Sequence, residues 1–407
     1  MLKHTIIRAK HILRYIASLP LRAIIFALLF SLLARKILLG LQAMRFVHEF
    51  RGQLEDKNFR QIAEELSAED PTLILILNRH TLNMTFNWLC NTQHMPGVHE
   101  SSLIVTLDRE SSVQLEHRWP KVRRLNWIVP ALRDPFNYGD GKYQLLYLLR
   151  ANLALAMLSL GKPFWMIQQD TFWRGDLRAL NLAEFKTNND VADVIFDRGT
   201  KSNGYLIAGG YFRVRATDGA LKYFQRLAQD LEKYYVPDNV YMTALCSEPH
   251  FKCGYIPFNV VTNWIWLFER AGNSDDSICD EISPTLLQFD GDTKLGEKLA
   301  KMRELGFYFL GDDGHSCNAF AVQKASEIVA GYGRQSVAQT HNLESFVDGN
   351  YSMGVEFSAK LAHWRSYSHW QFDLYQNIVG LFYKTRFTET FLNRIIFPYA
   401  HYFMITL

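Results

Sequence analysis

Polar side chains directly follow three apolar runs whose length is typical of β-strands. The runs cover residues 72–77, 102–107 and 164–167, and the polar residues after them are Asn78, Asp108, and Gln168 to Asp170. Such carboxylates and amides can hold a polar ligand through hydrogen bonds and charge. Ligands of open parallel sheets bind beyond the carboxyl ends of the strands, so these residues predict a ligand site there. Asn78 and Asp108 fit a turn or a helix cap equally well.

Two adjacent glycines, Gly209 and Gly210, lie within an apolar run that covers residues 205–214. Glycine lets the backbone approach a ligand closely because it has no Cβ atom. The alternative is tight packing between neighbouring strands.

The segments between these runs predict the elements that position the polar residues. Residues 143–160 repeat apolar side chains at helical spacing and end at Gly161-Lys162-Pro163. A second helix is predicted over 219–234, and a further strand over 191–196. Strands that alternate with helices predict an α/β fold with a mostly parallel sheet flanked by helices.

Four motifs occur in an order that resembles the nucleotide-diphospho-sugar transferases of the GT-A fold, over residues 71–311. They are Gln168-Gln169-Asp170, the strand and turn from Ala208 to Thr217, Asp238-Asn239, and Gln288-x-x-Gly291-x-x-Lys294. The corresponding family motifs are Asp-x-Asp, Asn-x-Gly with a basic, threonine-containing turn, Asp-Gln, and His-x-x-Gly-x-x-Lys. The resemblance implies transfer of a sugar from a nucleoside diphosphate sugar, UDP-linked in our interpretation.

The resemblance also implies a metal site, formed by Asp170 and Gln288. Two carboxylates one residue apart can hold a divalent cation that bridges the phosphates of the donor. Here Gln168 replaces the first carboxylate and Gln288 replaces the histidine. Because an amide oxygen is a neutral and weaker ligand, we expect Mn²⁺ or Mg²⁺ to be held weakly or to be absent.

The remaining roles follow from the same resemblance. Gly291 and Lys294 are expected to contact the diphosphate, and Gly209 and Gly210 to line the donor pocket. Asp238 and Asn239 are expected beside the transferred sugar, although this pair after Pro237 also fits a turn and helix cap. With Lys294 as the catalytic cation, Arg150 or Arg213 could help to neutralise the leaving diphosphate. Asn78, Asp108, Arg150, Gln168 and Asp170 complete the predicted donor site.

Charge is distributed unevenly along the chain. Residues 1–45 hold eight of the 44 Lys and Arg residues and none of the 41 acidic ones. The rest of the chain is therefore acidic overall, which argues against a nucleic-acid partner.

The basic arm contains an apolar run at residues 23–34 that predicts a signal anchor with a cytosolic N-terminus. The main domain would then lie in the lumen of the Golgi or endoplasmic reticulum, as in a single-pass type II membrane protein. An amphipathic helix in the membrane plane and a soluble helical arm are the alternatives.

The composition is that of a globular protein. The 48% of hydrophobic residues and the five cysteines exclude a disordered chain and a small disulfide scaffold. We predict four regions: a basic arm and anchor at 1–45, a polar helical stem at 46–70, a GT-A-like domain at 71–340, and an aromatic-rich helical extension at 341–407.

The five cysteines have no metal-ligand spacing. In an oxidising lumen, Cys246 and Cys253 are near enough in sequence to form a disulfide, and free buried cysteines are the alternative. Two glycosylation sequons, at Asn83 and Asn350, agree with a secretory location.

These observations together predict a type II membrane glycosyltransferase whose acceptor is a glycan or a protein. A catalytically inactive lumenal binding protein that keeps the fold is the first alternative. The second is a peripheral structural protein that uses the basic arm and the aromatic tail at a membrane.

Overall fold

A computed structural model of the chain describes residues 57–135, 141–180, 192–199, 207–233, 238–246, 248–258, 260–263, 284–289 and 297–330, with short pieces between 23 and 54. Most of the predicted arm and anchor and all of the predicted C-terminal extension lie outside the described residues. Gly291 and Lys294 also lie outside them. Within the described part of the chain, no helix is long and apolar enough to cross a membrane.

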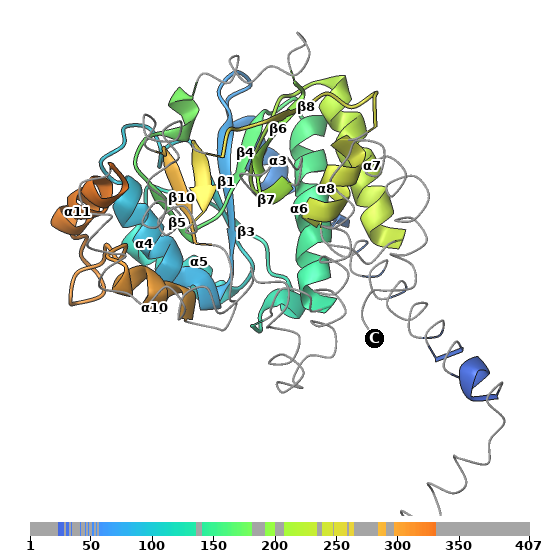
Figure 1. Ribbon diagram of the computed structural model, residues 1–407, viewed down its shortest axis with the longest axis horizontal. Helices are drawn as coiled ribbons and strands as arrows, with labels where there is room; N and C mark the ends of the chain where they lie inside the picture. The colour runs from blue at the N-terminus through green and yellow to red at the C-terminus, as the bar shows by residue number, and fades with distance from the viewer. Residues whose placement is uncertain are drawn as a thin grey trace, which may run out of the picture.

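A seven-stranded sheet with the order β3-β2-β1-β4-β7-β6-β8 forms the centre of the molecule (Figure 1). Its strands are β1 (Thr72–Leu77), β2 (Ser102–Thr106), β3 (Arg123–Asn126), β4 (Phe164–Ile167), β6 (Val194–Arg198), β7 (Ile207–Val214) and β8 (Cys253–Tyr255). Of these seven, β7 alone runs antiparallel to its neighbours β4 and β6. The prediction of a mostly parallel sheet is therefore confirmed.

Helices cover both faces of this sheet, as predicted (Figure 1). One side carries α3 (Lys57–Glu64), α6 (Gly141–Ser159), α7 (Asp218–Lys233) and α8 (Asp238–Cys246). The other side carries α4 (Leu82–Thr92), α5 (Arg109–Arg118), α10 (Glu297–Glu304) and α11 (Ala319–Ala330). That side also holds a small sheet of β5 (Thr171–Trp173), β10 (Leu286–Gln288) and β9 (Val261–Asn263). Three short 3₁₀ helices lie in the connections, η1 (Arg79–Thr81), η2 (Pro130–Leu132) and η3 (Leu177–Ala179).

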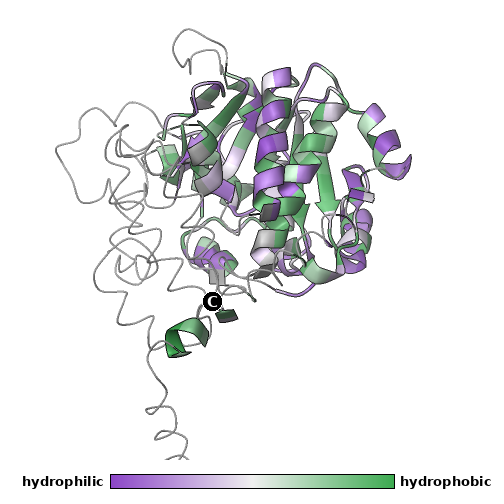
Figure 2. Cartoon of the chain, turned by 90° about the vertical axis from the view of Figure 1, so that its right-hand side faces the viewer, coloured by the Kyte–Doolittle hydropathy of each residue, from purple (hydrophilic) through white to green (hydrophobic). Residues whose placement is uncertain are grey.

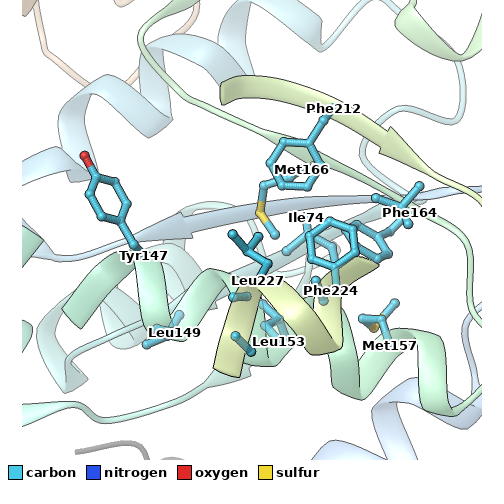
Figure 3. Close-up of a cluster of buried hydrophobic side chains, with 14 of the residues drawn as sticks. Ile74, Tyr147, Leu149, Leu153, Met157, Phe164, Met166, Phe212, Phe224 and Leu227 are labelled. Atoms are coloured by element: carbon cyan, nitrogen blue, oxygen red, sulfur yellow. The ribbon is translucent and has the colours of Figure 1, made fainter. Parts of the chain in front are cut away.

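The apolar runs form strands that are buried on both faces. In β1, Ile74 packs into the core on the α6 side, whereas Leu73 and Leu75 pack into the core on the α4 side. Figure 3 shows the α6-side core, where leucines of α6 and α7 pack beneath Met166 and Phe212. Each such side chain stabilises the fold by about 1.5–3 kcal/mol through burial.

Helix α7 shows why the helices lie flat on the sheet. Its buried residues Tyr223, Phe224, Leu227 and Leu231 recur every three or four positions, so they form one stripe. Polar residues occupy the opposite face, and hydrophilic residues are prominent on the outward sides of the helices in Figure 2.

The segment predicted as a polar stem contributes to the core of the domain. Helix α3 lies within it, and Phe59 and Ala63 of this helix are fully buried in the α6-side core. Leu66 continues the same stripe, and Lys162 donates a hydrogen bond to its carbonyl oxygen. Sequence analysis did not predict this packing, because charged residues such as Glu64 and Glu65 lie between and beside the apolar Phe59, Ala63 and Leu66.

Two disulfides cross-link the described part of the chain. The predicted Cys246–Cys253 bond joins the end of α8 to β8. A second bond, Cys90–Cys317, joins α4 to the segment before α11 across 227 residues, and no sequence pattern predicted it. Cys279 lies outside the described residues.

Candidate functional site

The topology gathers the predicted polar residues at one edge of the sheet. β1 and β4 are parallel neighbours, so Asn78 and Gln168 follow strands that end on the same side. β7 runs the opposite way and pairs Phe212 with Met166, so its first half, which contains Gly209 and Gly210, lies at this carboxyl edge.

Gly210 lies against two of the predicted amide ligands. Gln288 Nε2 donates a hydrogen bond to Gln168 Oε1 at 2.6 Å, which joins the end of β10 to the end of β4. A Cβ atom on Gly210 would lie 2.5 Å from Gln288 Nε2 and 3.0 Å from Gln168 Oε1. The absence of a side chain here lets the amide pair pack directly on β7.

Gly209 lies against the start of α8. Its φ of +78° is in the left-handed region that favours glycine, and an added Cβ would lie 2.8 Å from Asn239 Cβ. Asn239 Oδ1 is buried and has no hydrogen-bond partner among the described residues. An unpaired buried acceptor is costly, so this atom marks a position where a ligand donor would be favourable.

A buried ion pair lies beneath Gly209. Arg150 of α6 donates to Asp238 Oδ2 at 2.8 Å and also to the carbonyl oxygen of Gly209. The two charged side chains are only 9% and 4% exposed. Burial raises the pKa of the Asp238 carboxyl, and the charge of Arg150 opposes this rise. The pair therefore fixes the start of α8 against the glycine strand.

Asp197 of β6 is a buried residue of this edge that the sequence analysis missed. Its carboxylate accepts hydrogen bonds from the backbone N–H groups of Gly209, Gly210 and Tyr211 at 2.8–3.1 Å. Burial raises the pKa of Asp197 to about 7, and these hydrogen bonds oppose the rise. An acid inside the apolar strand Val194–Arg198 was the available signal, since a charge in a buried strand requires partners.

A second ion pair lies at the end of β4. Lys298 of α10 places its Nζ atom 2.6 Å from Asp170 Oδ2. Here the ammonium-bearing side chain is 24% exposed and the carboxylate side chain 10% exposed. Sequence reasoning selected Lys294 and missed Lys298, which lies four residues further along the sequence.

Tyr143, near the start of α6, is influenced by the charges of both ion pairs. Burial raises the pKa of its hydroxyl group, and the charges of Lys298, Arg150, Asp238 and Asp170 also act on it. Contacts between neighbouring residues place the two ion pairs on one edge of the sheet. Arg150 bonds to Gly209, and Gly210 lies against Gln168, two residues before Asp170.

Asn78 and Asp108 reach the same edge but act as caps. Asn78 Oδ1 accepts from His80 N, and its Nδ2 donates to the carbonyl oxygen of Leu132. Asp108 accepts from Ser111 N and from Arg79 N. The cap alternative therefore accounts for both side chains.

Arg213 lies away from the site. It pairs with Trp165 in the ladder between β7 and β4, on the far side of Phe212 from the glycines. The suggestion that it neutralises a diphosphate at the carboxyl edge is therefore not supported by its position.

A sequence model described as nucleotide-diphospho-sugar transferase matches residues 97–302, just over half of the chain. The chain belongs to this family. The match covers the residues of both ion pairs, the glycine pair and the amide pair. The family and the α/β architecture that the sequence predicted are therefore confirmed.

Solved glycosyltransferases show a distant likeness to the transferase. GlyE of Streptococcus pneumoniae has 11% identity and a TM-score of 0.40, with 64% of each chain covered. Mouse xyloside xylosyltransferase 1 in its apo form has 9% identity and a TM-score of 0.34 over 55% of this chain and 99% of that one. A Pyrobaculum calidifontis mannosyltransferase in complex with GDP-Man and Mn²⁺ has 12% identity and a TM-score of 0.29, over 92% and 99% of the two chains. No curated protein sequence matches significantly.

The predicted metal ligands do not form a set that suits a divalent cation. Asp170 is paired with an ammonium group, and the amides of Gln168 and Gln288 bond to each other. Within the described residues, no group of three His, Cys, Asp or Glu side chains gathers to hold a metal. Mn²⁺ and Mg²⁺ prefer charged oxygen ligands, so this arrangement of the transferase does not fit them.

Proposed function

We propose that the chain transfers a sugar from a nucleoside diphosphate sugar, UDP-linked, to a hydroxyl group of a glycan or protein acceptor. The bond from the anomeric carbon to the diphosphate breaks and a bond to the acceptor oxygen forms. The acceptor loses its proton, and the negative charge develops on the leaving diphosphate. Stabilising that charge is the main task of the site.

One observation carries this proposal: two ion pairs from four separate segments lie at the carboxyl edge of the sheet, beside the glycine pair and the amide pair. Fixed charges in a partly buried site are worth more than in water, and they need no rearrangement when the leaving group ionises. The resemblance assigns Gly291 and Lys294 to the diphosphate as well.

The orphan acceptor at Asn239 supports a place for the donor sugar. The Cβ atom of Asn239 lies against Gly209, and the described residues offer its Oδ1 atom no donor. A sugar hydroxyl group would satisfy it, as the predicted role of Asp238 and Asn239 requires. Asp238 itself is held by Arg150, so we assign it to positioning Asn239 rather than to a direct contact.

Hydrolysis of UDP-sugars without an acceptor tests the proposal. The full-length chain is incubated with a panel of UDP-hexoses and UDP-pentoses, and released UDP is measured. We expect release from at least one donor, and less from Asp170→Asn, because this carboxylate positions the ammonium group of Lys298. Asp312→Asn, the same change in an exposed turn, is the control. Absence of both hydrolysis and UDP binding would refute the proposal.

Binding without transfer is the second candidate, and the amide pair of Gln168 and Gln288 favours it. A site that lacks two of the family's charged ligands could keep nucleotide affinity and lose catalysis. Calorimetric binding of UDP with no sugar transferred from any donor would identify this outcome.

We also propose that the domain lies in the lumen of the secretory pathway on a type II anchor. Two disulfides support this location, because cytosolic proteins rarely keep them. Asn83 of the first sequon is exposed. Carbonate extraction of cell membranes tests the anchor, and release into the supernatant would exclude it. A mobility shift on endoglycosidase treatment, lost in an Asn83→Gln/Asn350→Gln variant, would place the domain in the lumen.

A further inference from the structure

We infer that Lys298 supplies the positive charge that binds the donor diphosphate, in place of a divalent cation. This inference rests on the proposed function and makes nucleotide binding independent of metal. It assigns a binding role to a residue that neither the family resemblance nor the motif spacing selected.

The first argument is the position of the ammonium group. Asp170 is the one carboxylate that remains of the Asp-x-Asp pattern, and Lys298 Nζ lies 2.6 Å from it. A cation bound to Asp170 would have to occupy the same neighbourhood. An ammonium and a divalent ion at one carboxylate repel each other strongly, so binding of the metal would require Lys298 to leave.

The second argument concerns the amide pair. Gln288 donates a hydrogen bond of 2.6 Å to Gln168, and the amide pair packs directly on Gly210 of β7, which has no side chain. Neither amide contributes a negative charge. The end of β4 therefore has a single carboxylate, that of Asp170, and the ammonium group of Lys298 is its counter-charge.

The third argument is access to the solvent. The two ion pairs at this edge contain two cations. Arg150 is only 9% exposed and is held by Asp238 and by the carbonyl oxygen of Gly209. Lys298 is 24% exposed and lies over a less exposed carboxylate. Of these two cations, Lys298 is therefore the one that an incoming diphosphate can reach. An ammonium group has three N–H donors, so it can bridge Asp170 and a phosphate oxygen.

Titration calorimetry of the full-length chain with UDP, and separately with inorganic pyrophosphate, tests the inference. We expect the wild-type Kd for UDP to agree in EDTA and in Mn²⁺ within about twofold. Lys298→Met should weaken binding about 10- to 100-fold in both conditions, as loss of a charged hydrogen bond does. Lys298→Arg keeps the charge and should bind within about tenfold of wild type, less tightly because its fork has a different shape.

The matched control is Lys301→Met, which removes the same charge from the same helix three residues later. It should leave the Kd unchanged. If Lys298→Met does not fold, the comparison of EDTA with Mn²⁺ in the wild type and the Lys298→Arg variant still decide the question.

A converse variant gives a readout that does not depend on turnover. Gln168→Asp combined with Lys298→Met places two carboxylates one residue apart and removes the ammonium group. Electron paramagnetic resonance should detect Mn²⁺ binding to this variant and none to the wild type, and its UDP affinity should become dependent on Mn²⁺.

The outcomes separate the inference from the proposed function. UDP binding that requires Mn²⁺ in the wild type would overturn the role of Lys298 and leave the transferase proposal intact. An unchanged Kd in Lys298→Met would do the same. No UDP or pyrophosphate binding in either condition would refute the proposed function, and with it the inference.

Discussion

The two ion pairs at the carboxyl edge of the sheet differ in depth. Arg150–Asp238 is almost fully buried and is tied to the backbone of Gly209, whereas Lys298–Asp170 keeps its ammonium-bearing side chain about a quarter exposed. A buried charge that loses its partner is left uncompensated, while water can replace the partner of a more exposed one. The buried Arg150–Asp238 pair is therefore expected to stabilise the fold, whereas Lys298 of the more exposed pair can bind a ligand.

The surroundings of the pairs extend this contrast. The deep pair shares its environment with Asp197, whose carboxylate binds three successive backbone N–H groups of β7. The outer pair joins the segment between β4 and β5 to α10. We refer to these as the deep region (Arg150, Asp197, Gly209 and Asp238) and the outer region (Asp170 and Lys298).

The largest effect is expected from breaking the deep pair. Arg150→Met should lower the free energy of unfolding by about 3–5 kcal/mol, because Asp238 stays buried without a counter-charge. Chemical denaturation at neutral pH measures this loss. Arg124→Met is the control, since its partner Glu116 is 65% exposed and the loss there should stay under about 1 kcal/mol. Equal losses in the two variants would contradict the contrast in depth.

Gly209→Ala should give the next largest loss, about 2–3 kcal/mol, from left-handed strain together with the contact to Asn239. Gly161→Ala is a matched control: its φ is also positive, at +67°, but nothing lies within 4 Å of an added Cβ. That variant should lose only about 1–2 kcal/mol. If denaturation shows the same loss for both glycines, the contact between β7 and α8 adds nothing to stability.

Sequence patterns were sufficient for the fold because apolar periodicity determines it. The runs at 72–77 and 164–167 form β1 and β4 with the predicted bounds, and the helix predicted over 143–160 is observed at Gly141–Ser159. Burial on both faces leaves no polar alternation in such strands, so their pattern is hard to mistake. The disulfide Cys90–Cys317 could not be foreseen, because a bond across 227 residues depends on tertiary packing alone.

The candidate site was predicted in part, and the misses share a cause. Motif spacing located Asp170, Gln168, Gln288, the glycine pair, Asp238 and Asn239, which the structure brings to one edge. It did not show which polar groups satisfy each other. Asp197, Lys298 and Tyr143 are defined by partners that lie far away in sequence, and Asn78 and Asp108 prove to be caps. Pairing of this kind is a property of the folded chain.

The deep region should also show a pH dependence. Because burial raises the pKa of Asp197 from 3.8 to about 7, the native state binds its proton more tightly than the unfolded state between these values. The free energy of unfolding should therefore fall as the pH rises through this window, by about 2 kcal/mol between about pH 5 and pH 7.

Denaturation at a series of pH values measures this slope. In Asp197→Asn the slope should be smaller, although the variant is less stable overall because an amide N–H group then faces a backbone N–H. Asp313→Asn, a carboxylate in an exposed turn, is the control and should keep the wild-type slope above pH 5. A slope that is unchanged in Asp197→Asn would show that another group titrates.

The smallest effect on stability is expected in the outer region, and it is the one that tests the contrast most directly. Lys298→Met should lower the free energy of unfolding by about 1 kcal/mol at most, because water can reach the partner carboxylate once the side chain is removed. The same denaturation experiment as for Arg150→Met measures it, with Lys301→Met as the reference for a lost charge on α10. Lys298 lies 2.6 Å from Asp170, the remaining carboxylate of the Asp-x-Asp pattern. If Lys298 contributes little to stability, ligand binding explains its position better than the fold does. A loss as large as that of Arg150→Met would assign Lys298 to the fold, and the two regions would then have the same role.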